Sequence, residues 1–145
     1  MLASEAQRYG VTVVSTAASE PQLIELVFAT ASREKAQALL VHHDPFLISQ
    51  SAQIGELALS HKLPVLAQAR EHVLAGALKS YGVDLRDQWR RAAAFVAKIL
   101  DGAKPAELPV EQATRIELVL NKKTAAALGI RVVSEIMVRA DEVIE

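Results

Sequence analysis

The stretch ALLVHHDPFLISQ, residues 38–50, gathers the side chains with the most evident chemical potential, because His42, His43 and Asp44 are adjacent. Imidazole and carboxylate groups can bind a metal ion or exchange protons with a substrate. However, neighbouring strand residues point to opposite faces, so His42 and His43 cannot both chelate one ion from a regular strand. Asp44 followed by Pro45 is also a typical helix start, since aspartate favours the N-cap and proline the first helical position. We interpret the stretch as a strand end and a helix cap, and retain Asp44 as a candidate ligand contact.

Two further stretches place polar side chains where predicted strands end. Arg70 and Glu71 follow a strand and form either the charged first turn of a short helix or a ligand contact. Ser80 and Tyr81 precede Gly82, and this stretch is either a turn with a packed tyrosine or a hinge with a ligand-facing hydroxyl. The carboxyl ends of parallel strands form the ligand crevice of α/β sheets, so both stretches are candidates for a binding site.

No complete catalytic constellation accompanies these candidates. The sequence has no cysteine, no phosphate-binding loop of the G-x-x-x-x-G-K or G-x-G-x-x-G type, and no G-x-S-x-G nucleophile elbow. His61 and His72 are isolated and expected to be solvated, whereas Trp89 lies on an apolar helix stripe and is expected to be buried. We therefore predict no catalytic residue, no metal site and no cofactor.

The composition is typical of an ordinary globular domain. The chain has 145 residues, of which 51% are hydrophobic, and a formal net charge of −1. This length allows one domain with a real core, and the near-neutral charge and 4% aromatic content give no reason to expect nucleic acid as a partner. No apolar run reaches the roughly 18 residues of a membrane span. The N-terminus lacks the basic and apolar regions of a signal peptide, so no export is expected for the chain as written and the compartment is open.

Strand and helix patterns alternate along the chain. Short apolar or β-branched runs predict strands at residues 11–17, 37–43, 63–69, 78–82 and 114–121. Helical spacing predicts helices at residues 19–36 with Ser19 as N-cap, and at 44–62, 70–77, 84–102, 122–130 and 134–144. This alternation predicts an α/β fold with a three-layer parallel sheet and right-handed crossovers, in a single domain over residues 1–145.

The clearest of these helices spans residues 84–102. Asp84 is a favourable N-cap, and Gly102 ends the helix. Its apolar residues form one stripe at helical spacing, comprising Leu85, Trp89, Ala92, Val96 and Ile99. A stripe of this width needs a partner surface to cover it.

Several segments together resemble one known family. Residues 70–82 follow the pattern R-E-F-V-x-A-G-G-L-M-S-Y-G, residues 99–112 read ILDGAKPAELPVEQ, residues 117–129 read ELVLNKKTAAALG, and the chain closes in RADEVIE. A strand ending in D-P and a later strand opening with LP precede them. Their order and spacing resemble the carboxy-terminal half of ABC-transporter substrate-binding proteins, in the branch that includes aromatic and branched amino-acid binders.

The resemblance implies a type I periplasmic binding protein, in which two Rossmann-like lobes joined by a hinge hold the ligand between them. The chain would be the C-terminal lobe, with helix 84–102 belonging to the missing lobe or to a dimer partner. It would be non-catalytic and would bind a small-molecule ligand such as an amino acid. Its protein partners would be an ABC permease and a second copy of itself. The homodimer would form through the apolar face of helix 84–102. The family is periplasmic or extracytoplasmic.

The resemblance also implies a half-cleft lined by Asp44, Phe46, Arg70, Ser80 and Tyr81. Arg70 would pair with a ligand carboxylate. Tyr81 and Phe46 would pack on an apolar part of the ligand.

The sequence departs from the family pattern at three positions, where Ala77 replaces glycine, Lys79 replaces methionine and His72 replaces phenylalanine. Lys79 and His72 would lie near the cleft and bear on which ligand is bound. One wall of a cleft seldom buries a small molecule as fully as a complete site does.

Three functions follow as hypotheses. The leading one is a substrate-binding domain of an ABC transport system that binds a small metabolite such as an amino acid. The alternative is a truncated structural or regulatory remnant that dimerises without binding a small molecule. A small flavodoxin-like enzyme is compatible with the alternation of strands and helices, but no nucleophile–base pair or phosphate loop supports it.

Overall fold

The computed structural model describes residues 2–112 and 115–145, and its helices and strands alternate along the chain. The helices are α1 Leu2–Arg8, α2 Pro21–Arg33, α3 Pro45–Ser49, α4 Ser51–Ser60, α5 Arg70–Leu74, α6 Leu85–Leu100, the 3-10 turn η1 Pro105–Glu107, α7 Lys122–Ala127 and α8 Ser134–Arg139. The strands are β1 Leu39–Val41, β2 Val65–Ala67, β3 Lys79–Val83, β4 Ile116–Asn121 and β5 Glu142–Ile144. The predicted α/β fold is confirmed.

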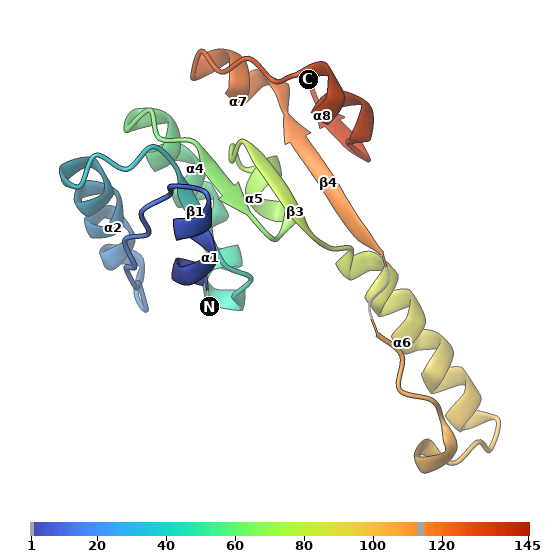
Figure 1. Cartoon of the computed structure of the whole chain (residues 1–145). Helices are drawn as coiled ribbons and strands as arrows, with labels where there is room; N and C mark the ends of the chain where they lie inside the picture. Colours follow the sequence, from blue (N-terminus) through green and yellow to red (C-terminus); the bar gives the residue numbers. More distant parts are fainter. Residues whose placement is uncertain (1, 113–114) are drawn as a thin grey trace.

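The strands of the described residues form one sheet in the order β1-β2-β3-β4-β5 (Figure 1). β1, β2 and β3 are parallel neighbours, and β5 is parallel to β4. The pair β3–β4 is antiparallel, which differs from the all-parallel expectation. The physical reason is the path of the chain, because α6 continues outward from β3 and the following segment returns to β4 without a crossover over the sheet (Figure 1).

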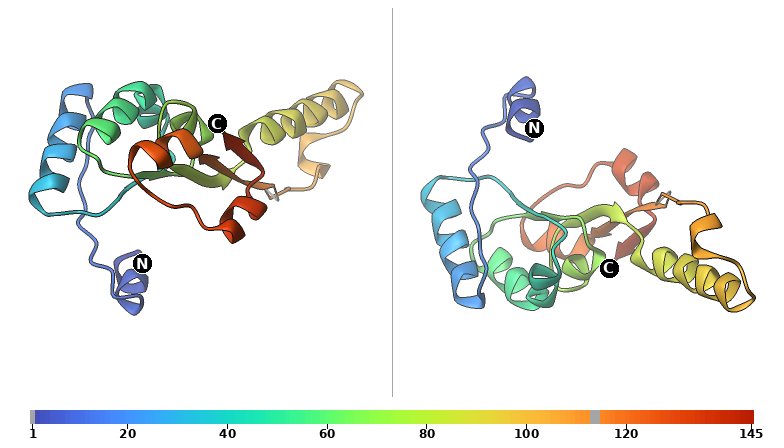
Figure 2. Two further views of the ribbon diagram at one scale, coloured as in Figure 1. Left: turned by 90° about the horizontal axis from the view of Figure 1, so that it is seen from above. Right: turned by 90° about the horizontal axis from the view of Figure 1, so that it is seen from below.

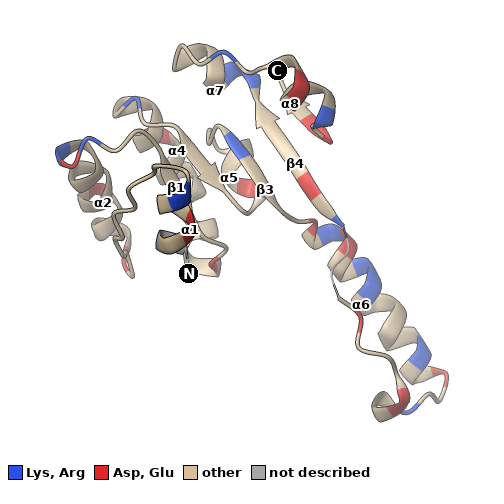
Figure 3. Cartoon of the chain, in the orientation of Figure 1, with Lys and Arg blue, Asp and Glu red and all other residues tan. Residues whose placement is uncertain are grey.

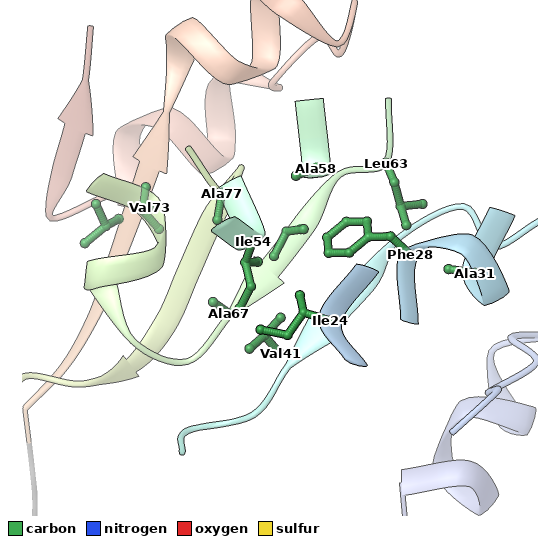
Figure 4. Packing of buried hydrophobic residues seen from close by; sticks show 12 residues of the cluster. Ile24, Phe28, Ala31, Val41, Ile54, Ala58, Leu63, Ala67, Val73 and Ala77 are labelled. Atoms are coloured by element: carbon green, nitrogen blue, oxygen red, sulfur yellow. The ribbon is translucent and has the colours of Figure 1, made fainter. Parts of the chain in front are cut away.

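The core lies between the sheet and the helices α2, α4 and α5. Phe28 of α2, Ile54 of α4 and Val65 of β2 are buried in one cluster, and Figure 4 shows Phe28 and Ile54 near Ala67 and Val41 of the strands. Alternation along the strands decides which residues join this core. Ser80 is buried on the helix-covered face, whereas the next residue, Tyr81, is 59% exposed on the other face.

Helix starts follow local capping chemistry where the sequence provides it. The Asp44 carboxylate accepts a hydrogen bond from the backbone N–H of Leu47 at 3.1 Å, which confirms the predicted cap of α3. Asp84 caps α6 by accepting from the backbone N–H of Arg86 at 3.0 Å. The expected Ser19 cap is wrong, because α2 begins at Pro21 after Glu20, with no side-chain cap. The helix expected over residues 44–62 is divided at Gln50 into α3 and α4.

The predicted strand at residues 11–17 is not formed. These residues make no strand pairing, and the sheet ends at β1. Val11 and Val14 are more than half exposed, and Thr16 lines a small cavity of about 110 Å³ against β1. β-branched residues favour an extended backbone, but a strand also needs a partner in register, which composition does not specify.

The C-terminal segment also differs from the expectation of one helix over residues 134–144. α8 ends at Arg139, and the chain then forms β5 beside β4. Asp141 anchors this change, because its carboxylate accepts from the backbone N–H of Leu118 at 2.8 Å while its own N–H donates to the carbonyl of Leu118. The predicted strand 114–121 is confirmed as β4 from Ile116, and its first residue, Thr114, lies outside the described residues.

Helix α6 projects from the end of the sheet (Figures 1 and 2). None of its residues is buried, and Val96, Ile99 and Leu100 of its apolar side are exposed. The stripe predicted from the sequence therefore exists, and within the described residues nothing covers it.

Candidate functional site

A hollow of about 550 Å³ lies where the parallel strands β1, β2 and β3 end and α6 begins. We call it the strand-end hollow. Its wall is formed by His43, Gln68, Gly82, Val83, Leu85, Gln88, Trp89 and Ala92. The volume is within the range of small-molecule sites, and the carboxyl end of a parallel sheet is where α/β proteins bind ligands.

One face of α6 forms a side of the strand-end hollow. Leu85, Gln88, Trp89 and Ala92 follow one another at helical spacing, so they lie on the same face. Trp89 was expected to be buried, and this expectation is wrong, since 75% of it is exposed. The amphipathic stripe was identified correctly, but it faces the hollow and solvent instead of a core.

The ends of the strands form the opposite side. The side-chain Oε1 of Gln68, just after β2, accepts a hydrogen bond from the backbone N–H of His43, just after β1, at 2.8 Å. Gly82 packs so closely on this turn that a β-carbon there would lie 2.0 Å from the carbonyl oxygen of Gln68. The close approach of β3 to the end of β2 therefore requires glycine at this position.

Charged side chains surround the base of α6 instead of the hollow. The Nη2 of Arg70 lies 2.7 and 2.6 Å from the two carboxylate oxygens of Glu142, and its Nε lies 3.9 Å from Glu117. The side chain of Arg70 is only 16% exposed, so these carboxylates neutralise a cation that is largely removed from water.

The same network continues to the first turn of α6. The Nη2 of Arg86 donates to Glu117 at 2.9 Å and its Nε to Asp84 at 3.2 Å, while Arg115 lies 3.4 Å from the other oxygen of Asp84. Burial acts to raise the pKa of Asp84, but hydrogen bonds from the Arg86 side chain and from the backbone of Asp87 and Arg86 outweigh it. The pKa of Asp84 is therefore lowered from its usual value.

A buried polar pair supports α5 behind the strand ends. The Nδ1 of His72 is 3.0 Å from the hydroxyl of Ser51, which itself donates to the carbonyl of Ile48 at 2.6 Å. His72 is 1% exposed, so the expectation of a solvated histidine is wrong. Its Nε2 has no hydrogen-bond partner. Burial lowers the pKa of His72, Glu71 acts to raise it and His43 acts to lower it further.

The five residues predicted to line a half-cleft are distributed around the hollow, and none of them is among its wall residues. Asp44 and Phe46 follow His43 into α3, where Phe46 packs against the core. Arg70 is engaged by Glu142 and Glu117, as described above. Ser80 points into the interior with an unpartnered hydroxyl, and Tyr81 is on the exposed face of the sheet.

Sequence reasoning missed three polar wall residues, namely His43, Gln68 and Gln88. His43 was considered as part of a metal or catalytic cluster and was interpreted as a strand end. Gln68 was recognisable in principle, because it directly follows a predicted strand, which is the same signal that selected Arg70. Helical spacing could not predict that Gln88 lines the hollow, because this depends on the direction in which α6 leaves the sheet.

Two other kinds of feature are absent from the described residues, a metal-ligand cluster and a membrane-spanning helix. In residues 2–112 and 115–145 no group of three or more histidine, aspartate or glutamate side chains is placed to hold a metal ion. Within the same ranges, no helix has the length and apolar character needed to cross a bilayer. Along α6 basic side chains predominate, and its acidic residue Asp87 lies in the first turn (Figure 3).

Comparisons with known proteins point to the same architecture. Among solved structures, an ABC domain in complex with L-Trp from Streptococcus pneumonia is 29% identical with a TM-score of 0.86, over 98% of this chain and 48% of that one. A conserved domain protein from Vibrio cholerae O1 biovar El Tor is 28% identical with a TM-score of 0.85, over 97% of this chain and 47% of that one. A ligand-free, open substrate-binding protein from Clostridium difficile, 22% identical with a TM-score of 0.68, supports the fold.

Sequence comparisons identify the family. The tyrosine-binding protein of Clostridioides difficile strain R20291 is 26% identical over 100 residues, which is 69% of this chain and 29% of that protein. The chain thus spans about half the length of the solved structures it matches and less of this relative. The family model described as ABC transporter substrate binding protein matches residues 1–144. The chain therefore belongs to the family of ABC transporter substrate-binding proteins.

Proposed function

We propose that this chain is a ligand-binding lobe of an ABC transport system, that it binds an amino acid in the strand-end hollow, and that it catalyses no reaction. The observation that carries the proposal is the position of the hollow, at the carboxyl ends of β1, β2 and β3 beside α6. The relatives named for tyrosine and crystallised with L-Trp support an amino acid as the ligand. An ABC permease is the proposed downstream partner.

Asp44, Phe46, Arg70, Ser80 and Tyr81 remain proposed as ligand contacts. For Arg70, a ligand carboxylate would have to compete with Glu142, whose oxygens are already within 2.7 Å. Alanine substitution of each of the five, followed by calorimetric titration with the amino acid that binds best, tests the assignment. A variant that keeps the wild-type affinity removes its residue from the site.

The exposed apolar side of α6 supports a second part of the proposal, a homodimer that covers this helix. Val96 is 55% and Leu100 81% exposed, and large apolar side chains in such positions favour association. Residues 84–102 would pack either on the other lobe of a binding protein or on a second copy of this chain.

Native mass spectrometry of the freshly purified chain is the first test, because it reports the oligomer and any retained ligand together. A thermal-melt series with free amino acids follows, in which a ligand at about 100 times its Kd should add about 2.7 kcal/mol of stability. Val96→Asp, which lies outside the hollow wall, should convert a dimer to a monomer. A dimer that no amino acid stabilises would favour the alternative of a dimerising module that binds no small molecule.

A further inference from the structure

The sheet has an uncovered apolar surface on the face opposite α2, α4 and α5. The core residues Val41, Val65 and Val119 alternate along the strands with residues of this other face. Strand register places its apolar members side by side: Leu40, Leu66, Tyr81, Val83, Ile116 and Leu118. We call this surface the open sheet face. Within the described residues, Leu40 remains 46% exposed and Ile116 49% exposed.

The projecting helix α6 carries a surface that is complementary to the open sheet face. Its exposed apolar residues, Trp89, Val96, Ile99 and Leu100, lie on one side of the helix, away from Arg90. The 16 residues of α6 give a helix about 24 Å long. Strands β1 to β4, at about 4.8 Å spacing, span about 14 Å, so one such helix is long enough to cross the open sheet face.

Helix α6 is held away from the open sheet face of its own chain. Only Asp84 separates the end of β3 from the start of α6, and the helix continues outward from the strand (Figure 1). Arg86 in its first turn donates to Asp84 at 3.2 Å and to Glu117 at 2.9 Å. A reversal of α6 onto its own sheet would break these bonds. A second copy of the chain has no such constraint.

Two copies related by a two-fold axis can use both surfaces at once, because each α6 then lies on the open sheet face of the other copy. From the exposed fractions of these side chains, this contact removes roughly 1,500 Å² from water over both copies, which is the standard size of a stable interface. A helix on the open sheet face also completes the helix–sheet–helix layering in which α/β sheets bury both faces. The one charged residue of β1 to β4 on this face is Lys79, whose long stem lets its ammonium group reach solvent at the edge of the contact.

We propose that the homodimer forms by reciprocal docking of α6 on the open sheet face of a second copy. This inference rests on the homodimer proposed above and specifies which surface receives the helix. Val83 belongs both to the open sheet face and to the wall of the strand-end hollow, and Trp89 belongs both to the apolar side of α6 and to that wall. The second copy therefore borders the hollow and adds the enclosure that a single lobe lacks.

Native mass spectrometry of the full chain and its variants tests the docking surface. Leu40→Asp places a charge on the open sheet face, and it should weaken the dimer about a hundredfold or more, as Val96→Asp on α6 should. Leu26→Asp is the matched control, because Leu26 is 59% exposed on α2, outside both surfaces, and this variant should remain dimeric. Circular dichroism checks the fold of each variant. Ile116→Asp on β4 repeats the test if Leu40→Asp does not fold.

The outcomes separate this inference from the homodimer on which it rests. A wild-type monomer would refute the proposed homodimer, and this inference with it. A dimer that is lost in Val96→Asp but kept in Leu40→Asp and Ile116→Asp would overturn only the docking surface. The chain has no cysteine, so Val96→Cys can form a disulfide only between copies. Each Val96 should face the strands of the other copy, so this disulfide should form slowly, and rapid formation would show helix-to-helix packing and overturn the inference.

Discussion

Replacement of His72 by phenylalanine, the residue that the family pattern has at this position, should remove much of the pH dependence of folding. His72 is 1% exposed, its Nδ1 contacts Ser51, and its Nε2 has no partner. Burial lowers the pKa of His72 from the ordinary value of 6.5. The unfolded chain therefore binds the proton more readily than the folded chain. Above pH 6.5 the free energy of unfolding is not reduced by protonation of His72. Below pH 6.5 it decreases as the pH falls toward the lowered folded-state pKa of His72.

The expected size of the effect differs between high and low pH. At pH 8 the variant no longer buries an unpaired nitrogen, which removes a penalty of about 1–3 kcal/mol. The larger ring adds overpacking strain of about 1–3 kcal/mol, so these two terms largely cancel. Ser51 is not left without a partner, since its hydroxyl still donates to Ile48. At pH 5.5 the wild type must protonate a buried imidazole or unfold, and the variant should be the more stable protein.

Urea unfolding followed by circular dichroism at pH 8, 7, 6 and 5.5 measures the effect. The difference between the two proteins should widen as the pH falls, by about 1.4 kcal/mol for each unit by which folding lowers the pKa. His42→Phe replaces an exposed histidine in the same way and should reproduce the pH dependence of the wild type. Parallel curves for wild type and His72→Phe would refute the argument that burial of this imidazole couples folding to pH.

Three further substitutions test the core, the hollow and the charged network. Phe28→Ala removes a fully buried ring and should destabilise the fold by about 3–5 kcal/mol in urea unfolding, without a specific effect on ligand selectivity. Gly82→Ala places a β-carbon 2.0 Å from the backbone oxygen of Gln68, so it should cost about 1–3 kcal/mol or more and also weaken ligand binding, as measured by calorimetry. Arg70→Leu leaves Glu117, 8% exposed, with less positive charge nearby, and should cost about 2–3 kcal/mol, reduced at high salt. A melt unchanged by Arg70→Leu would show that the ion pairs contribute no net stability.

Capping residues in the sequence predicted two helix starts, because such starts depend on hydrogen bonds between residues close together in the chain. Asp44-Pro45 and Asp84 specify helix starts through hydrogen bonds within one turn, and both were predicted correctly. The strand at residues 11–17 was not, because a strand exists only through its pairing with another. The β5 strand was missed for the converse reason. Its residues continue a helical pattern, but Asp141 contacts Leu118 and places them beside β4.

The candidate site illustrates a related limit. Periodicity showed that Trp89 lies on one side of α6, but the direction in which α6 leaves the sheet decides whether that side meets a core or a hollow. Likewise His72 has no neighbour in sequence that marks it as buried, and its environment arises from packing of α5 on α4 through Ser51. Selecting residues that follow strands led to the strand ends, beside which the hollow lies. It did not distinguish Gln68, which is on the wall, from Arg70, which is engaged in ion pairs.

The separation of charged and uncharged groups around α6 has a consequence for how the site works. α6 has no buried residue, so packing contributes little to its position. The ion pairs of Arg86 with Asp84 and Glu117 instead fix its first turn to β4 and to the end of β3. Trp89 follows this first turn on the same helix and belongs to the hollow wall, as does Gln68. The charged network therefore lies beside the hollow without lining it, because Asp84, Arg86 and Glu117 are not among the wall residues.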